Sequence, residues 1–105
     1  MPSSLRLAVA DLKTFRPTRR FQGAYFSLAT ASAPVVKAAF VVSKKVAPLA
    51  VTRNLIKRRS RAALSPLAAA LRPSHYVFYA KKEATTASFS EIKNDIEKLA
   101  GRCAA

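Results

Sequence analysis

The stretch that decides the fold is residues 40–61, which read FVVSKKVAPLAVTRNLIKRRSR. Its first residues belong to a run from Val35 to Ser43 that is rich in β-branched and aromatic residues, which predicts a well-covered strand. Pro48 stands where a first helical turn tolerates proline, and residues 49–64 contain neither Gly nor Pro. We therefore expect a strand that leads into a helix of about four turns.

The expected helix is amphipathic, with cations concentrated on one side. At ~100° per residue, one side gathers the side chains that can bond phosphate or base edges: Arg53, Asn54, Lys57, Arg58 and Arg61. The opposite side gathers apolar residues, with Arg59 as an exception: Val51, Leu55, Ile56, Ala62 and Ala63. We expect the apolar side to pack on a sheet and the cationic side, extended by Lys44 and Lys45, to face solvent.

The charge distribution predicts a polyanionic partner. The 105 residues include 19 Lys and Arg against 5 Asp and Glu, a net charge of +14, while 50% of the residues are hydrophobic. Residues 12–82 contain no acid at all. A one-signed stretch of this length repels itself unless a polyanion is bound, and the apolar content argues against a disordered tail. Nucleic acid is the expected partner; a merely soluble basic protein is the alternative.

Residue counts exclude several classes of protein. A single cysteine, Cys103, cannot form an internal disulfide, and with a single histidine, His75, it cannot make a zinc site. Two glycines are too few for a phosphate-binding loop or a dinucleotide fingerprint, so we expect no small-molecule cofactor. The apolar runs are too short to span a membrane. The length favours one domain, residues 1–105, in a reducing, cytoplasmic setting.

Periodicity predicts the elements before the central block. We expect a short helix at residues 8–15 and a half-buried strand at residues 24–30, where Phe26 and Leu28 share one face. The strand at residues 35–43 would pair with it as a hairpin.

The C-terminal part is predicted to add one strand and one helix. A Ser-Pro pair interrupts the long helix, so residues 66–71 are expected to form a second short helix or a kinked continuation. Residues 75–80 alternate as an aromatic strand. Ser88 and Glu91 form a capping box for a last helix, whose apolar residues recur at helical spacing before Gly101: Phe89, Ile92, Ile96 and Leu99. A helix between strands indicates an α+β or α/β fold.

The central block resembles the signature of the bacterial ribonuclease P protein subunit. That family has a strand ending in Ser-Lys-Lys, then Ala-Val, then an Arg-Asn-Arg motif followed by Lys-Arg and a further Arg. Residues 40–46 and 50–61 follow the same order. The segments Tyr25-Phe-Ser-Leu and Tyr76-Val-Phe-Tyr-Ala-Lys resemble the family's first and last strands, so nearly the whole chain is covered.

Four positions depart from the family pattern. Leu55 replaces the second Arg of the motif and falls on the expected apolar side, where packing would replace a polar contact. Ser60 stands where the family usually has an aliphatic residue. Leu12 and Ala29 stand where family members carry aromatic residues, which leaves the stacking of bases to the remaining aromatic and arginine side chains.

The resemblance implies a fold, partners and sites. The implied fold is α+β: a four-stranded mixed sheet with about three helices and a left-handed β-α-β crossover. The implied partners are ribonuclease P RNA and precursor tRNA, whose 5′ leader is removed with Mg²⁺ held mainly by the RNA subunit and the substrate. The implied RNA-binding residues are Lys44, Lys45, Arg53, Asn54, Lys57, Arg58 and Arg61. The implied leader-binding cleft comprises Phe15, Arg19, Arg20, Tyr25 and Ser27.

The residues themselves agree that the polypeptide carries no catalytic group. Two-metal phosphoryl chemistry needs clustered carboxylates, whereas Asp11 is isolated and the other acids belong to the C-terminal segment. A structured-RNA-binding protein of ribosomal type, without a role in cleavage, is the alternative function. Phe15 has an alternative as well, as an ordinary core residue.

Overall fold

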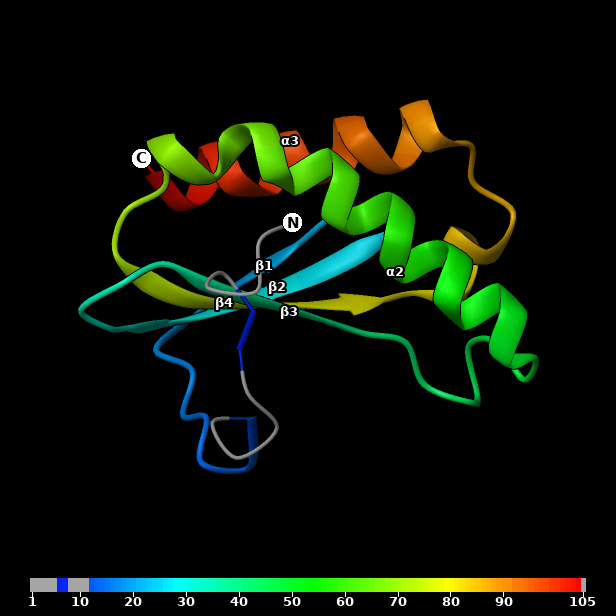
Figure 1. The fold of residues 1–105 in the computed structure, drawn as a ribbon, viewed down its shortest axis with the longest axis horizontal. Helices are drawn as coiled ribbons and strands as arrows, with labels where there is room; N and C mark the ends of the chain where they lie inside the picture. Colours follow the sequence, from blue (N-terminus) through cyan, green and yellow to red (C-terminus); the bar gives the residue numbers. More distant parts are fainter. Residues whose placement is uncertain (1–5, 8–11, 105) are drawn as a thin grey trace.

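The computed structural model describes residues 6–7 and 12–104, and its strands form one mixed sheet in the order β1-β2-β4-β3. The strands are β1 (Arg19–Gln22), β2 (Phe26–Ser32), β3 (Lys37–Val41) and β4 (Ser74–Ala80). Two long helices, α2 (Ala50–Leu64) and α3 (Phe89–Ala104), cover one face of the sheet (Figure 1). Two short 3₁₀ helices, η2 (Ser65–Ala70) and η3 (Lys82–Thr85), complete the order.

The expected hairpin between the second and third strands is wrong. β4 lies between β2 and β3, pairing antiparallel with β2 and parallel with β3. β4 has fully buried side chains on both of its faces, among them Val77 and Phe78 at 0% exposure, and a strand of this kind belongs inside the sheet. Periodicity identified the strands but carried no information about their neighbours. It also missed β1, whose sequence Arg-Arg-Phe-Gln has little strand character.

α2 is the crossover that connects the parallel strands β3 and β4. In Figure 1 both strands run the same way, β4 lies behind β3, and α2 passes above them, which makes the crossover left-handed. The connection is opposite to the right-handed default, and it agrees with the hand that the resemblance implied. α2 continues directly into η2, so the expected interruption at the Ser-Pro pair is a change of helix type.

The core fills the space between the helices and the sheet. Phe78 stacks on Phe40 with ring centroids 5.1 Å apart and meets Phe26 edge-on at 6.5 Å. Both helices contribute to this core, and in α3 the buried positions recur at helical spacing: Ile92, Ile96, Leu99 and Cys103. This stripe runs past Gly101 to Cys103, so α3 continues beyond the apolar positions that the sequence pattern identified. One glycine costs a helix only about 1 kcal/mol, and the burial of Cys103 favours continuation.

The capping box at the start of α3 is confirmed. The hydroxyl of Ser88 accepts the N–H of Glu91 at 3.2 Å, and the Glu91 carboxylate accepts the N–H of Ser88 at 2.9 Å.

None of the described helices is long and apolar enough to cross a membrane.

Residues 12–18 lie on the other face of the sheet. Of the expected helix at residues 8–15, residues 8–11 lie outside the described residues, and Leu12 and Lys13 are helical. The chain then passes below the sheet, on the side opposite the helices (Figure 1). The backbone N–H of Thr18 donates to Thr30 O at 2.8 Å and brings the segment into β1.

A buried carboxylate joins α3 to the turn before β2. Asp95, 6% exposed, accepts the backbone N–H groups of Ala24, Tyr25 and Phe26 at 2.9, 3.0 and 2.9 Å. A side chain at Gly23 would collide with it, since a Cβ there would lie 2.7 Å from both carboxylate oxygens. Lys81 reinforces the same turn by donating from Nζ to Gly23 O at 2.6 Å. The turn that joins β1 to β2 is therefore fixed by the last helix.

Asp95→Asn should destabilise the protein. The amide offers one acceptor oxygen in place of two and sets its own N–H groups against backbone donors, which should cost about 2–3 kcal/mol of unfolding free energy. Urea unfolding checks the loss. Glu97→Gln is the matched control, because it removes the same charge from an exposed position of α3; equal losses in the two variants would contradict a structural role for Asp95.

Candidate nucleic-acid interface

A short turn delivers the chain from β3 to α2 and exposes two lysines. The backbone N–H of Ala47 donates to Ser43 O at 3.0 Å, and that of Val46 donates to the Ser43 hydroxyl at 3.2 Å. Lys44 and Lys45 lie exposed on this turn. α2 then begins at Ala50 without a side-chain cap.

The buried side of α2 is not the side that the sequence predicted. The fully buried residues are Ile56, Ser60, Ala63 and Leu64. Val51 and Ala62, expected inside, are exposed, Val51 at 73%, and Leu55 is half-buried. The helix is therefore rotated by roughly a quarter turn from the expected orientation, by the ~100° per residue of an α-helix.

Ser60 explains the rotation. Its hydroxyl donates to Ile56 O one turn back at 2.7 Å, which satisfies the polar group inside the helix and leaves a small side chain suited to close packing. The spacing of ~100° per residue places this serine on neither side of the helix. With Ser60 at the centre of the buried stripe, the flanking cations move toward the edges of the interface.

Arg53 is thereby engaged by the protein itself. Its Nη1 donates to the carbonyl oxygens of Ala47 and Pro48, both at 2.8 Å, and the residue is half-buried. This guanidinium holds the approach turn against the first turn of α2. The expectation that Arg53 is a free, exposed cation is wrong.

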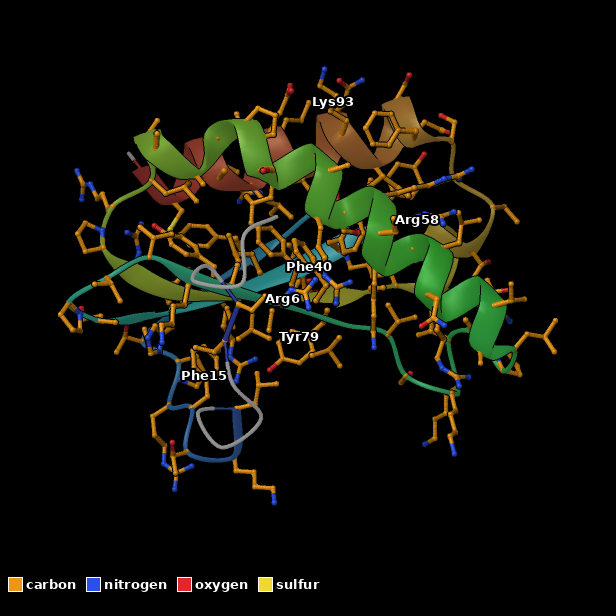
Figure 2. The ribbon with its side chains drawn as sticks, in the orientation of Figure 1. Arg6, Phe15, Phe40, Arg58, Tyr79 and Lys93 are labelled. Atoms are coloured by element: carbon orange, nitrogen blue, oxygen red, sulfur yellow. The ribbon has the colours of Figure 1, made fainter. Side chains whose placement is uncertain are left out.

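Lys57 and Arg61 lean over the outer edge of the sheet. Both line a hollow of about 210 Å³ between α2 and β3, together with Phe40 and the exposed Arg6. Arg6 is held there because the next N–H, that of Leu7, donates to Ala38 O at 3.0 Å (Figure 2). Three cations therefore converge on one edge. Sequence reasoning did not include Arg6 among the RNA-binding residues, because its position depends on a single bridge to β3.

Asn54 and Arg58 point outward from α2. Both are exposed, and they border a shallow, largely apolar hollow with Val51 and Leu55. Arg59 lies on the opposite flank and donates to Ala87 O at 3.4 Å, beside the start of α3. The seven expected RNA-binding residues thus occupy four places: the approach turn, the contact of Arg53, the β3 edge and the outward face.

The face of the sheet away from the helices presents a second candidate surface. Because Phe26 and Leu28 point toward the helices, Ser27 and its cross-strand neighbours point away. Tyr79 faces Ser27 across β2 and β4 and is 38% exposed. Arg20 pairs with Ala29 and lies on the same face, exposed. Sequence reasoning assigned Tyr79 to a strand but missed it as an exposed aromatic on a central strand.

Phe15 lies beneath this face. It borders a hollow of about 240 Å³ with Arg16, Ala31 and His75, under the end of β2 and β4 (Figure 2). Phe15 and His75 are both half-buried. Phe15 is therefore neither a core residue nor a fully exposed one.

The structure separates two of the expected leader-binding residues from the others. Arg19 lies on the helix side, over the Phe21 ring at 4.9 Å, with Nη1 donating to Cys103 O at 3.4 Å. The Tyr25 hydroxyl donates to Glu91 of α3 at 2.5 Å. Phe15, Arg20 and Ser27 share the opposite side.

The described carboxylates at the sheet are engaged in structural contacts. Glu91 accepts the Ser88 N–H and the Tyr25 hydroxyl, and these hydrogen bonds hold the pKa of Glu91 below its usual range. The same contact raises the pKa of Tyr25, because its hydroxyl is bonded to a carboxylate. Among residues 6–7 and 12–104, no group of three His, Cys, Asp or Glu side chains lies close enough to hold a metal ion.

Comparison with known proteins identifies similar chains. A family model described as Ribonuclease P matches residues 4–104. The RNase P protein of Staphylococcus aureus superimposes with a TM-score of 0.81 at 22% identity, covering 95% of this chain and 94% of that one. The RNase P protein of Thermotoga maritima gives a TM-score of 0.80 at 20% identity, covering 92% and 96%. A search of curated protein sequences found no match.

Arg53→Ala should destabilise the fold, whereas Arg58→Ala should not. Loss of two charged hydrogen bonds to carbonyls at the start of α2 is expected to cost about 1–3 kcal/mol, and the exposed Arg58 makes no such contact. Thermal or urea unfolding of the two variants checks the difference. Equal stability of the two would show that Arg53 is as free as the sequence suggested.

Proposed function

The chain belongs to the ribonuclease P protein family, and from this premise we propose that it binds the catalytic RNA through α2 and the 5′ leader of precursor tRNA through the opposite face of the sheet. In this role it promotes endonucleolytic removal of the leader. The observation that carries the proposal is the set of cations converging at the β3 edge: Arg6, Lys57 and Arg61.

The contribution of α2 is electrostatic. Lys57 and Arg61 with the exposed Asn54 and Arg58 present donors along one helix, and the turn with Lys44 and Lys45 extends them. Such side chains bind RNA phosphates and release counterions, so the free energy of binding depends steeply on salt. Close approach of two RNA segments is otherwise opposed by phosphate repulsion, which these cations reduce.

The opposite face suits a single strand. Tyr79 offers an aromatic surface on which an unpaired base can stack, and Ser27, Arg20 and Phe15 border it. Single-stranded RNA is held by this combination of stacking and phosphate contacts. Arg19 and Tyr25 face α3 and are not part of the proposed leader surface.

Within residues 6–7 and 12–104, no cluster of side chains fits a Mg²⁺ site. Mg²⁺ requires oxygen ligands, chiefly carboxylates and phosphates. Asp95 is occupied by three backbone N–H groups, and Glu91 caps α3. We assign the Mg²⁺ that drives hydrolysis to the RNA subunit and substrate, and to the polypeptide the non-catalytic role in the ribonucleoprotein, acting in the cytoplasm.

Reconstitution tests the function directly. The protein, added to a bacterial ribonuclease P RNA at low Mg²⁺, should stimulate 5′ processing of precursor tRNA and should favour leader-bearing tRNA over the processed form. RNA binding without stimulated cleavage would leave the alternative, a structured-RNA-binding protein without a role in processing.

Lys57→Gln with Arg61→Gln should weaken binding to the RNA subunit. Removing two phosphate contacts should lower the slope of log K against log salt by about 2. Lys93→Gln with Lys98→Gln is the matched control, since it removes the same charge from exposed positions of α3. Equal effects of the two double variants would mean that only net charge matters.

Tyr79→Leu should reduce the preference for leader-bearing substrate. Loss of one stacked base corresponds to about 1–3 kcal/mol, or roughly 5- to 150-fold in relative affinity. Phe89→Leu removes an aromatic of similar exposure, 42% against 38%, from the first turn of α3 and should leave the preference unchanged. If Tyr79→Leu leaves the preference for leader-bearing substrate unchanged, this face of the sheet does not bind the leader.

A further inference from the structure

The helix-side face of the sheet changes character at one end. Across β1, β2 and β4 one cross-strand row consists of Phe21, Leu28 and Phe78, and all three belong to the core or pack against it. The next row on the same face consists of Arg19, Thr30 and Tyr76. One row further, Ser32 pairs with Ser74. A face that packs under helices would be expected to stay apolar, so these polar rows require another explanation.

The polar rows line a hollow that lies beside the end of α3. Its volume is about 480 Å³, and Cys103, near the last turn of the helix, forms part of its wall. Arg72 enters from the loop before β4, and Ala33 and Pro73 add apolar surface. This hollow lies on the helix side of the sheet, on the β1–β2–β4 side, whereas Lys57 and Arg61 lie over the β3 edge. It lies on the other face of the sheet from the proposed leader surface, and Ser32, at the end of β2, borders both this hollow and the hollow beside Phe15.

The lining contains two guanidinium groups and no carboxylate. Arg19 donates one N–H to Cys103 O at 3.4 Å. This contact offsets the partial negative charge at the C-terminal end of α3, which would otherwise repel a bound anion. The Arg72 side chain is exposed, and no contact with a described residue occupies its guanidinium. Its carbonyl accepts the Tyr76 hydroxyl at 2.6 Å, which fixes the loop that carries it. Arg72 thus supplies the uncompensated charge.

We propose that this hollow binds the phosphate ester of a nucleotide, either free or at an RNA terminus. Arg72 and the free N–H groups of Arg19 bind the phosphate oxygens, and the hydroxyls of Ser32 and Ser74 complete the donor set. Guanidinium forks match phosphate geometry, and charge-assisted bonds of this kind are the strong ones. Ala33 and Pro73 provide apolar walls for the sugar or base. The proposal does not depend on the function assigned to α2 or to the opposite face.

Titration of the full-length protein tests the site. The probes are inorganic phosphate, adenosine 5′-monophosphate, and a short single-stranded RNA carrying either a 5′-phosphate or a 5′-hydroxyl. Binding is monitored by the amide chemical shifts of the protein. Phosphate and the mononucleotide should shift the signals of Ala33, Ser74 and their neighbours. Mononucleotide binding as tight as that of the phosphorylated RNA indicates a free nucleotide; tighter binding of the phosphorylated RNA than of either other nucleotide probe indicates a strand terminus.

Variants separate this site from general charge attraction. Arg72→Gln should raise the Kd of the mononucleotide about tenfold, and Arg72→Lys should restore part of the affinity. Lys98→Gln, an exposed cation of α3, should change it less than twofold by screening of a distant charge. Ser32→Leu, which narrows the hollow without a change of charge, should also weaken binding. Equal affinities in Arg72→Gln and Lys98→Gln, or shifts confined to α2, would overturn the proposal.

Discussion

The parallel pairing of β3 with β4 is the constraint on which the rest of the structure depends. Two parallel neighbours cannot be joined by a tight turn, so the chain must cross over the sheet, and residues 50–64 form that crossover. The helix is thereby fixed above the edge strand, where Lys57 and Arg61 reach past β3. A cationic helix in this position cannot turn away from solvent. The topology of the sheet therefore determines where the proposed RNA-binding side chains of α2 lie.

The protein tolerates its one-signed charge by sending neighbouring cations in different directions. Arg53 turns back to two carbonyl oxygens, Arg59 reaches toward Ala87, and Arg58 points outward. Like charges at spacings of three and four residues repel by a few tenths of a kcal/mol per pair, and this separation reduces the repulsion. Two of the three acids of α3, Glu91 and Asp95, are meanwhile engaged in the cap and the turn. The cations at the β3 edge are the ones that we propose bind RNA.

The sequence predicted the elements well and their arrangement poorly. The helix at residues 49–64, the last strand and the capping box of Ser88 and Glu91 follow from local pattern, and all are present. The neighbours of β4 and the existence of β1 depend on long-range pairing, which local pattern does not encode. The predicted orientation of α2 was wrong because the Ser60 hydroxyl donates a hydrogen bond to its own helix and can therefore be buried. Tyr79 and Arg6 acquire their roles only through cross-strand contacts.

The central claim is that the protein binds two RNA partners through two separate surfaces. Site-directed probing in the assembled complex tests this claim most directly. A cleavage reagent would be tethered to Arg58→Cys on α2 or to Ser27→Cys on the opposite face, since the native Cys103 is buried. In the complex of protein, RNA subunit and precursor tRNA, cuts from position 58 should fall in the RNA subunit and cuts from position 27 in the 5′ leader. Cuts from both positions in the same RNA segment would contradict the account.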